Sequence, residues 1–244
     1  PGGLLQGTTG AGIDPCAALQ AELELASGEI REIAILLGAA DSEAAARAAA
    51  TAYRNVSRTR AALERSVATW ERRLSVIRVR TPEPSFDAML NRWTLYQALG
   101  CRMWARSALY QSSGAYGFRD QLQDVMAFLY AEPALARAHL LRAAARQFLE
   151  GDVQHWWHPQ SGRGVRTRFA DDLVWLPYVV DHYVQVTGDR SVLDEPVPFL
   201  RMRALEPHEQ EIYDLPEVTE ERASLYQHCL RALRRACTTG THGL

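Results

Sequence analysis

The chain has 244 residues, 47% of them hydrophobic, so it can bury a substantial core as one large domain or two smaller ones. Its formal net charge of −2 argues against a nucleic-acid partner, which would favour a basic surface. The four cysteines lack the spacing of a metal-binding pair, and no apolar run reaches the roughly 18 residues that a membrane helix needs. We therefore expect a globular protein of a reducing compartment.

Residues 1–40 differ in pattern from the rest of the chain. After a glycine-rich opening, residues 19–26 alternate apolar and polar side chains, and a second apolar run at 30–38 follows the turn signal Ser-Gly-Glu. This pattern predicts a β-hairpin. Because an isolated hairpin is marginal in water, we expect residues 1–40 to complete a β-domain whose earlier strands are not in this sequence.

A helical linker is predicted over residues 41–83. Ser42 is placed to cap an alanine-rich helix, and residues 57–74 carry apolar side chains at helical spacing. Pro82 and Pro84 then interrupt the chain. We place a domain boundary at this interruption, because proline disfavours continuation of a helix.

Residues 84–244 read as helices joined by loops, so the predicted fold class is mainly α. The first helix has apolar residues nearly all round and is expected to be deeply buried. Long loops that contain glycine favour an α/α toroid over a compact bundle, which prefers short connections. The predicted helices cover residues 85–110, 119–131, 133–151, 171–189 and 218–237.

The segment Ser-Gly-Ala-Tyr-Gly-Phe-Arg-Asp-Gln-Leu-Gln-Asp, residues 113–124, combines a flexible loop with a dense polar cluster at a helix start. Arg119, Asp120, Gln123 and Asp124 fall close together around the first turns of that helix. The helix dipole by itself explains the two carboxylates. The alternative is a sugar-binding site, because carboxylates and guanidinium groups match neighbouring hydroxyls.

Residues 151–172 read as a polar loop that carries His155, Trp156, Trp157 and His158. Tryptophans in a loop are often platforms for sugar rings, although one of them could instead plug the loop onto the core. The sequence does not decide between Trp156 and Trp157. Three arginines in this loop allow either a phosphate clamp or a solvated surface: Arg163, Arg166 and Arg168.

Asp171 and Asp172 precede the next helix. They could cap it and strengthen its first turn, and paired carboxylates are also what cleavage of a glycosidic bond requires. The histidines at positions 139, 182 and 228 lie within predicted helices and read as core-edge or surface residues. No histidine pair has the spacing of a zinc site, so we predict no metal.

Three stretches together resemble glycoside hydrolase family 94. They are residues 90–130, with Tyr-Gly-Phe-Arg-Asp-Gln-Leu-Gln-Asp, residues 148–189, with Gln-His-Trp-Trp-His-Pro, and the closing Thr-His-Gly-Leu. Within the family they are most similar to the phosphorylase-like domains of cyclic β-1,2-glucan synthases. Residues 1–80 resemble the end of the family's β-sandwich and its helical linker, with less distinctive motifs.

The resemblance implies that residues 84–244 are the N-terminal part of an (α/α)6 barrel. It also implies inverting phosphorolysis of a β-glucosidic bond, in which an aspartate protonates the leaving oxygen while inorganic phosphate attacks the anomeric carbon. Phosphate arrives as an anion and needs no general base. No metal or organic cofactor is implied, and phosphate is a co-substrate.

The resemblance also suggests the residues that hold substrate. Arg119 and Asp124 match the family's Arg-Asp-x-x-Gln-Asp segment, which binds the glucosyl unit, and Asp120 and Gln123 belong to the same segment. A weaker match gives substrate contacts to four further residues: Gln154, His155, Trp156 and Asp171.

One departure from the family pattern concerns the general acid. In the family this aspartate lies in a Gly-Asp-Trp-Asn-Asp segment shortly after His-Gly-Leu-Pro, and the present sequence ends at His242, Gly243 and Leu244. We therefore expect the general acid beyond Leu244, no catalytic residue within these 244 residues, and an inactive, truncated domain.

Two alternatives remain open at this stage. The chain could belong to a free-standing cellobiose or oligoglucan phosphorylase of the same family, or to a non-catalytic helical module that binds glucan. The expected partners are a β-glucan or oligosaccharide, phosphate and the remainder of the same polypeptide, and a homodimer is compatible with the resemblance. The implied location is the cytoplasmic side of an inner-membrane multidomain protein.

Overall fold

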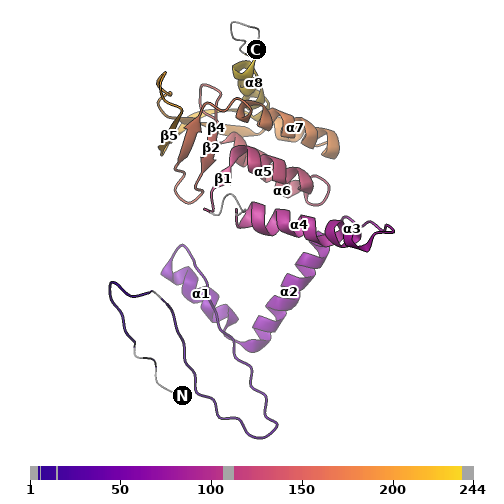
Figure 1. Ribbon diagram of the computed structural model, residues 1–244, viewed down its shortest axis with the longest axis vertical. Coiled ribbons are helices and arrows are strands. Elements are labelled where there is room, and N and C mark those ends of the chain that lie inside the picture. Colours follow the sequence, from indigo (N-terminus) through magenta and orange to yellow (C-terminus); the bar gives the residue numbers. More distant parts are fainter. Residues whose placement is uncertain (1–4, 6, 15, 107–112, 238–244) are drawn as a thin grey trace. The chain divides into compact units, whose positions relative to one another are not determined.

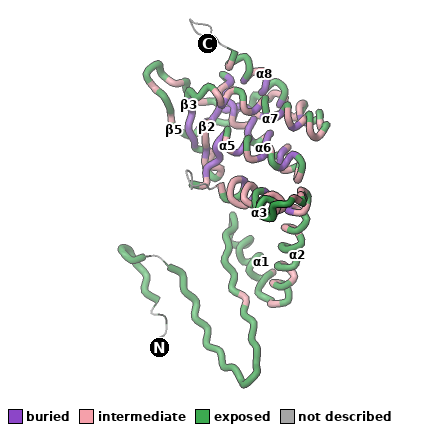
Figure 2. Tube along the Cα trace, turned by 45° about the vertical axis from the view of Figure 1, so that its right-hand side comes forward, coloured by how far each residue is buried: buried purple, intermediate pink, exposed green. Residues whose placement is uncertain are grey.

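A computed structural model describes residues 5, 7–14, 16–106 and 113–237 (Figure 1). The chain divides into two compact units, Pro1–Val67 and Ala68–Leu244. Buried residues gather in the second unit, whereas the first is exposed along most of its length (Figure 2). The hydrophobic core therefore belongs to the second unit.

In the first unit, residues 16–40 are extended and exposed. The expected turn is present, since the amide of Glu29 donates to the carbonyl of Ala26 over 3.0 Å. The predicted hairpin is nevertheless wrong, because the described residues 19–26 and 30–38 form no strand pair. A two-stranded pair has little stability of its own when no further strand or helix covers it.

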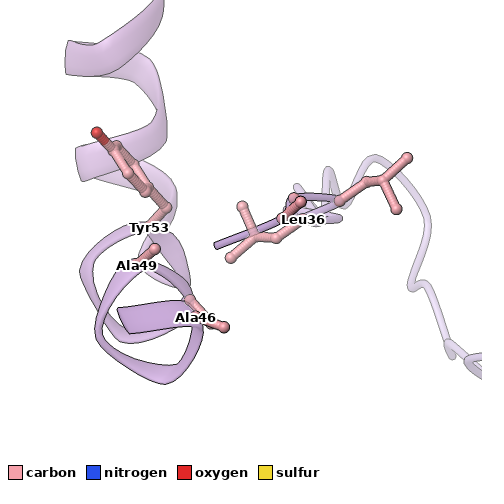
Figure 3. A pocket seen from close by; sticks show the side chains of 8 residues that line it. Leu36, Ala46, Ala49 and Tyr53 are labelled. Atoms are coloured by element: carbon pink, nitrogen blue, oxygen red, sulfur yellow. The ribbon is translucent and has the colours of Figure 1, made fainter. Parts of the chain in front are cut away.

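Both predicted linker helices are confirmed. Helix α1 (Glu43–Tyr53) starts at Ser42, whose hydroxyl accepts a hydrogen bond of 3.2 Å from the amide of Ala45. Helix α2 (Val56–Leu74) follows after a short break. In the first unit a cavity of about 380 Å³ separates α1 from residues 36–39 (Figure 3), and its lining side chains are apolar except for the hydroxyl of Tyr53.

The first predicted helix of the second unit runs without a break from Pro84 to Trp104. It consists of α3 (Pro84–Ala88), η1 (Met89–Trp93), α4 (Thr94–Gln97) and η2 (Ala98–Trp104), of which η1 and η2 are π-helical. Only one stripe is buried, formed by Leu95, Leu99 and Met103. The expectation of deep burial is wrong, because Phe86, Trp93 and Trp104 are about half exposed. Of the rest of the predicted helix, residues 105 and 106 are not helical, and residues 107–110 lie outside the described residues.

In the part of the chain that the structure describes, four further helices enclose the core. They are α5 (Phe118–Val125), extended by the 3-10 turn η3 (Met126–Phe128), α6 (Pro133–Ala144), α7 (Asp172–Thr187) and α8 (Leu225–Ala236). Helix α6 contacts the other three (Figure 1). Fully buried side chains hold the helices together, among them Leu122, Phe128, Leu140, Leu176 and Leu225.

Two antiparallel sheets accompany the helices. Strands β1 (Tyr116–Gly117), β2 (Gln154–Trp157), β3 (Gly164–Thr167) and β5 (Glu211–Asp214) form one sheet in the order β1-β2-β3-β5. Strands β4 (Pro196–Arg201) and β6 (Glu217–Ser224) form the other sheet. The 3-10 turn η4 (Ser191–Asp194) directly precedes β4 in the chain.

The sheets correct two expectations. The segment 151–172 is not a polar loop, because it contains the β2–β3 hairpin. Residues 218–224 are a strand rather than the start of a helix, because backbone pairing with β4 overrides the helical propensity of their glutamates and arginine. The mainly helical class is confirmed with these sheets added, and the (α/α)6 barrel stays a prediction.

Gly164 allows β2 and β3 to approach closely. A Cβ atom at this position would clash with the carbonyl of Trp156 and lie 2.8 Å from the Cα of Trp157. We predict that Gly164→Ala destabilises the hairpin by about 1–3 kcal/mol, measured as a lower unfolding midpoint in urea.

The matched control is Gly100→Ala. A Cβ at Gly100 would lie 3.5 Å from the ring of Tyr96, which is an ordinary contact, and alanine favours a helix. This variant is expected to retain the wild-type midpoint or exceed it. Equal midpoints for both variants would contradict the close approach at Gly164.

Candidate functional site

Strand pairing brings two of the predicted segments together. In the β1–β2 pair, Tyr116 lies opposite Trp157 and Gly117 opposite Trp156, so the start of α5 lies beside the beginning of β2. Trp157 is fully buried and stacks on Tyr116, with 5.4 Å between ring centroids. Trp157 is therefore the tryptophan that packs the hairpin against the core.

Trp156 is half-buried at the other side of the hairpin. Its ring lies 5.3 Å from that of His158 and 5.4 Å from that of Tyr213, measured between centroids. These contacts lie on the face of the sheet that β2 shares with β5. Among the described residues, the ring contacts of Trp156 are with these two side chains and not with the charged residues of α5.

The first turn of α5 is unusually close-packed. Gly117 is the N-cap, and its amide donates to the side-chain oxygen of Gln121, which is buried. The carboxyl group of Asp120 folds back over Gly117, where a Cβ atom would lie 3.1 Å from the Asp120 Cγ. The helix dipole favours a carboxylate here, and the glycine leaves it room.

Arg119 and Asp171 form an ion pair across two elements. The distance between Arg119 Nη1 and Asp171 Oδ2 is 2.9 Å, and both side chains are 45% exposed. Burial alone would raise the pKa of Asp171, but hydrogen bonds from Arg119 and Trp175 outweigh it and lower that pKa. An exposed pair contributes little to stability, so both groups can exchange partners with a ligand.

Asp171 does not act as a side-chain cap. It occupies the N-cap position of α7, yet its carboxylate makes no capping hydrogen bond and instead accepts from Arg119 and, over 3.4 Å, from the indole of Trp175. The capping explanation for this residue is therefore wrong. Its carboxylate is turned toward α5.

Asp124 pairs with an arginine that the sequence did not indicate. Arg102, on η2, approaches Asp124 Oδ2 to 2.8 Å, and the two side chains are only 15% and 21% exposed. Burial raises the pKa of Asp124; the charge of Arg102 opposes this rise and the charge of Asp120 adds to it. Asp124 is thus a partly desolvated carboxylate.

His155 is paired with Asp172, at 2.8 Å between Nδ1 and Oδ2. The imidazole also packs on Phe169, with 4.7 Å between ring centroids. The hydrogen bond to Asp172 raises the pKa of His155, while burial raises the pKa of Asp172 against the opposing effect of the histidine. This pair joins β2 to the first turn of α7.

These side chains form one charged cluster, because each pair is within electrostatic reach of another. Asp120 acts on Arg119, Asp124 and His155, and Arg119 acts on His155 and Asp172. We call this group the α5–α7 cluster. Its members are Arg102, Arg119, Asp120, Asp124, His155, Asp171 and Asp172.

Two other predicted residues occupy different surroundings. Gln154 is fully buried, and its amide donates to the carbonyl of Gly162 over 3.1 Å, which ties the two ends of the hairpin together. Gln123 is exposed on α5. The structure therefore brings five of the eight predicted site residues into the cluster.

The three hairpin arginines all bind other groups of the protein, although only Arg166 is buried and Arg163 and Arg168 are exposed. Arg166 is fully buried and binds both carboxylate oxygens of Asp152 at 2.6 and 2.7 Å, besides Glu150 and two backbone carbonyls. Arg163 pairs with Asp214. Arg168 donates to the backbone carbonyls of residues 205, 206 and 209. These contacts favour a structural role over a phosphate clamp.

Arg102 and Asp172 were missed by sequence reasoning. An arginine within an apolar helix was the available signal for Arg102, because charged residues are seldom buried without a partner. Asp172 was considered as a first-turn residue of α7 or, with Asp171, as one of two paired carboxylates, but not as a partner of His155. Its contact with His155 spans 17 positions and depends on the hairpin, which the sequence did not predict.

The described residues contain no group of three or more histidine, cysteine, aspartate or glutamate side chains arranged to hold a metal ion. Among the same residues, no helix combines the length and apolarity that crossing a membrane requires.

Comparison with protein families identifies both parts of the chain. Residues 69–244 match the catalytic domain of the glycosyl hydrolase 94 superfamily, and residues 2–56 match its supersandwich domain. The chain belongs to the glycosyl hydrolase 94 superfamily. The resemblance drawn from the sequence motifs is thereby confirmed.

Individual relatives carry two kinds of name. The chain is 49% identical, over all its 244 residues, to the cyclic beta-(1,2)-glucan synthase NdvB of Rhizobium meliloti strain 1021. It is 28% identical to the N,N'-diacetylchitobiose phosphorylase of Vibrio furnissii, over 75% of its length, and 28% identical to the solabiose phosphorylase of Paenibacillus borealis, over 82%. It spans only 9%, 26% and 25% of these three proteins.

The pair of Arg102 and Asp124 gives a stability prediction. In Arg102→Met the partly buried carboxylate of Asp124 loses its counter-charge, so its pKa rises further above the value of the unfolded chain. Folding stability should then fall as pH rises from about 4 toward neutrality, by about 1–3 kcal/mol relative to wild type. Urea unfolding of the natural protein at several pH values measures this effect.

The double variant Arg102→Met with Asp124→Asn is the control. Without a carboxylate to desolvate, it should recover part of the lost stability at neutral pH. A double variant no more stable than Arg102→Met at every pH would show that Arg102 stabilises the fold by packing alone.

Proposed function

We propose that this chain forms part of a glycoside phosphorylase domain that transfers a glucosyl unit between a β-1,2-glucan and inorganic phosphate. Similarity along the whole chain to a protein named cyclic beta-(1,2)-glucan synthase supports the glucan. Two further relatives named phosphorylases support the type of reaction.

The observation that carries this proposal is the composition of the α5–α7 cluster. Four carboxylates lie within electrostatic reach of two guanidinium groups and one imidazole. This set leaves the cluster with an acidic excess, which disfavours a free anion. It suits a neutral polyhydroxylated ligand, because carboxylates accept hydrogen bonds from hydroxyls and guanidinium groups donate to them.

Exposure separates the roles of the paired residues. Arg119 and Asp171 are half exposed, so a sugar can compete for their hydrogen bonds at low cost. Asp124 is held by Arg102 in a partly desolvated position, where a hydrogen bond to a hydroxyl is stronger than in water. We propose that Arg119 and Asp124 hydrogen-bond the glucosyl unit. Further contacts would come from Asp120, Asp171 and His155.

In the proposed reaction, phosphate attacks the anomeric carbon from the face opposite the leaving oxygen, and the configuration inverts. The cluster holds and orients the sugar, which supplies the positional part of catalysis. We assign none of the described residues as the general acid. We also propose that the helices of the second unit belong to an (α/α)6 barrel.

The test is phosphorolysis by the natural protein, with the release of glucose 1-phosphate from β-1,2-linked glucooligosaccharides as the readout. Asp124→Asn keeps the shape of the side chain and removes its charge. We predict that it lowers kcat/KM by the equivalent of about 2–4 kcal/mol, because its hydrogen bonds tighten in the transition state. Asp214→Asn, on β5 and paired with Arg163, is the control and should retain wild-type kinetics.

The choice of donor distinguishes the alternatives. Activity on cellobiose that exceeds activity on β-1,2-glucan would favour an oligoglucan phosphorylase. Binding of glucan without release of glucose 1-phosphate by the natural protein would favour a non-catalytic module. Unchanged kinetics in Asp124→Asn would remove the cluster from the reaction.

A further inference from the structure

The β2–β3 hairpin contains an irregularity at one of the cluster residues. Gln154 pairs with Arg166 and Trp156 pairs with Val165, so β2 has one extra residue between two consecutive pairs. That residue is His155. A β-bulge of this kind turns the side chain of the extra residue out of the regular alternation of the strand.

The bulge gives His155 surroundings unlike those of its neighbours. Gln154 and Trp157 are fully buried, whereas the side chain of His155 is 28% exposed. Its ring rests on Phe169, and its Nδ1 is turned to Asp172. The two contacts fix the orientation of the imidazole. Its Nε2 makes no hydrogen bond to the described residues and is not one of their buried unpartnered atoms.

Asp172 is an unusual partner for an exposed histidine. Its side chain is only 4% exposed, and its second oxygen, Oδ1, is buried without a hydrogen-bond partner among the described residues. A buried carboxylate with an unused oxygen costs free energy, so stability alone does not account for it. The cost is understandable if the position of His155 matters for function.

The groups around the imidazole define its chemistry. Asp172 contacts it from α7, and the charges of Asp120 and Arg119 act on it from α5, while the charge of Asp171 acts on Asp172. Because Asp172 accepts the proton of Nδ1, Nε2 is left to accept from a hydroxyl when the ring is neutral or to donate when it is charged.

We propose that Asp172 is a positioning residue that holds His155, delivered by the bulge, so that Nε2 hydrogen-bonds a hydroxyl of the bound glucosyl unit. This inference rests on the proposed function of the α5–α7 cluster and deepens it. The pair adds a directed contact from β2 to the contacts that α5 provides. Asp172 acts through His155 and does not itself touch the sugar.

The experiment compares His155→Gln, Asp172→Asn and the double variant in the natural protein. The kinetics of phosphorolysis of β-1,2-linked glucooligosaccharides are measured across pH 5–9. Each single variant should lower kcat/KM by about tenfold or more, since a hydrogen bond that involves a charged partner is lost or misdirected. The double variant should be no worse than His155→Gln, because residues that act as one unit are not additive.

The pH profile provides a readout that a merely structural role would not change. The carboxylate raises the pKa of His155, so its removal in Asp172→Asn should move the bend of the kcat/KM profile to lower pH. His155→Gln should lose that bend. Asp181→Asn, exposed on the same helix, is the control and should keep both the rate and the profile.

The outcomes separate the two proposals. Additive losses in the double variant, or a bend that stays in place in Asp172→Asn, would overturn the positioning role. If Asp172→Asn unfolds, His155→Gln decides the matter alone, because its position is partly exposed; full activity and an unchanged profile would overturn the proposal. Full activity in Asp124→Asn as well would show that the sugar site itself is misplaced.

Discussion

The candidate site depends on one short backbone pairing, that of β1 with β2. Two residue pairs place Gly117 opposite Trp156 and Tyr116 opposite Trp157, and the stacked Tyr116–Trp157 rings hold the pairing in the core. Helix α5 starts directly after β1, and its first-turn charges therefore lie beside the hairpin. Arg119 of α5 also forms an ion pair with Asp171 at the start of α7, 52 positions along the chain.

Most helices could be predicted because their signals are local. The capping hydroxyl of Ser42 marks the start of α1, and Gly188 ends α7 in the left-handed conformation that glycine tolerates. The β2–β3 hairpin has no such local signal in the sequence. A fully buried Arg166 and a bulge at His155 break the alternation by which strands are found, and the carboxylates that neutralise Arg166 are distant from it in the sequence.

The sequence predicted most residues of the site, but not the ion pairs that they form. The family motif indicated Arg119 and Asp124, and both lie in the cluster. Sequence spacing could not show that Arg102 neutralises Asp124 or that Asp172 holds His155, because both contacts require the tertiary fold. The pairs differ in exposure. Among the described residues, Asp124 pairs with Arg102 and Asp172 with His155 in shielded positions, whereas the side chains of Arg119 and Asp171 are half exposed.

We propose that the α5–α7 cluster holds a glucosyl unit. A crystal structure of the natural protein with a β-1,2-linked glucose disaccharide bound would locate the sugar. We expect a pyranose whose hydroxyls lie within hydrogen-bond distance of Arg119 and Asp124. A sugar bound elsewhere, with the Arg119–Asp171 and Arg102–Asp124 pairs intact and in contact with water alone, would contradict it.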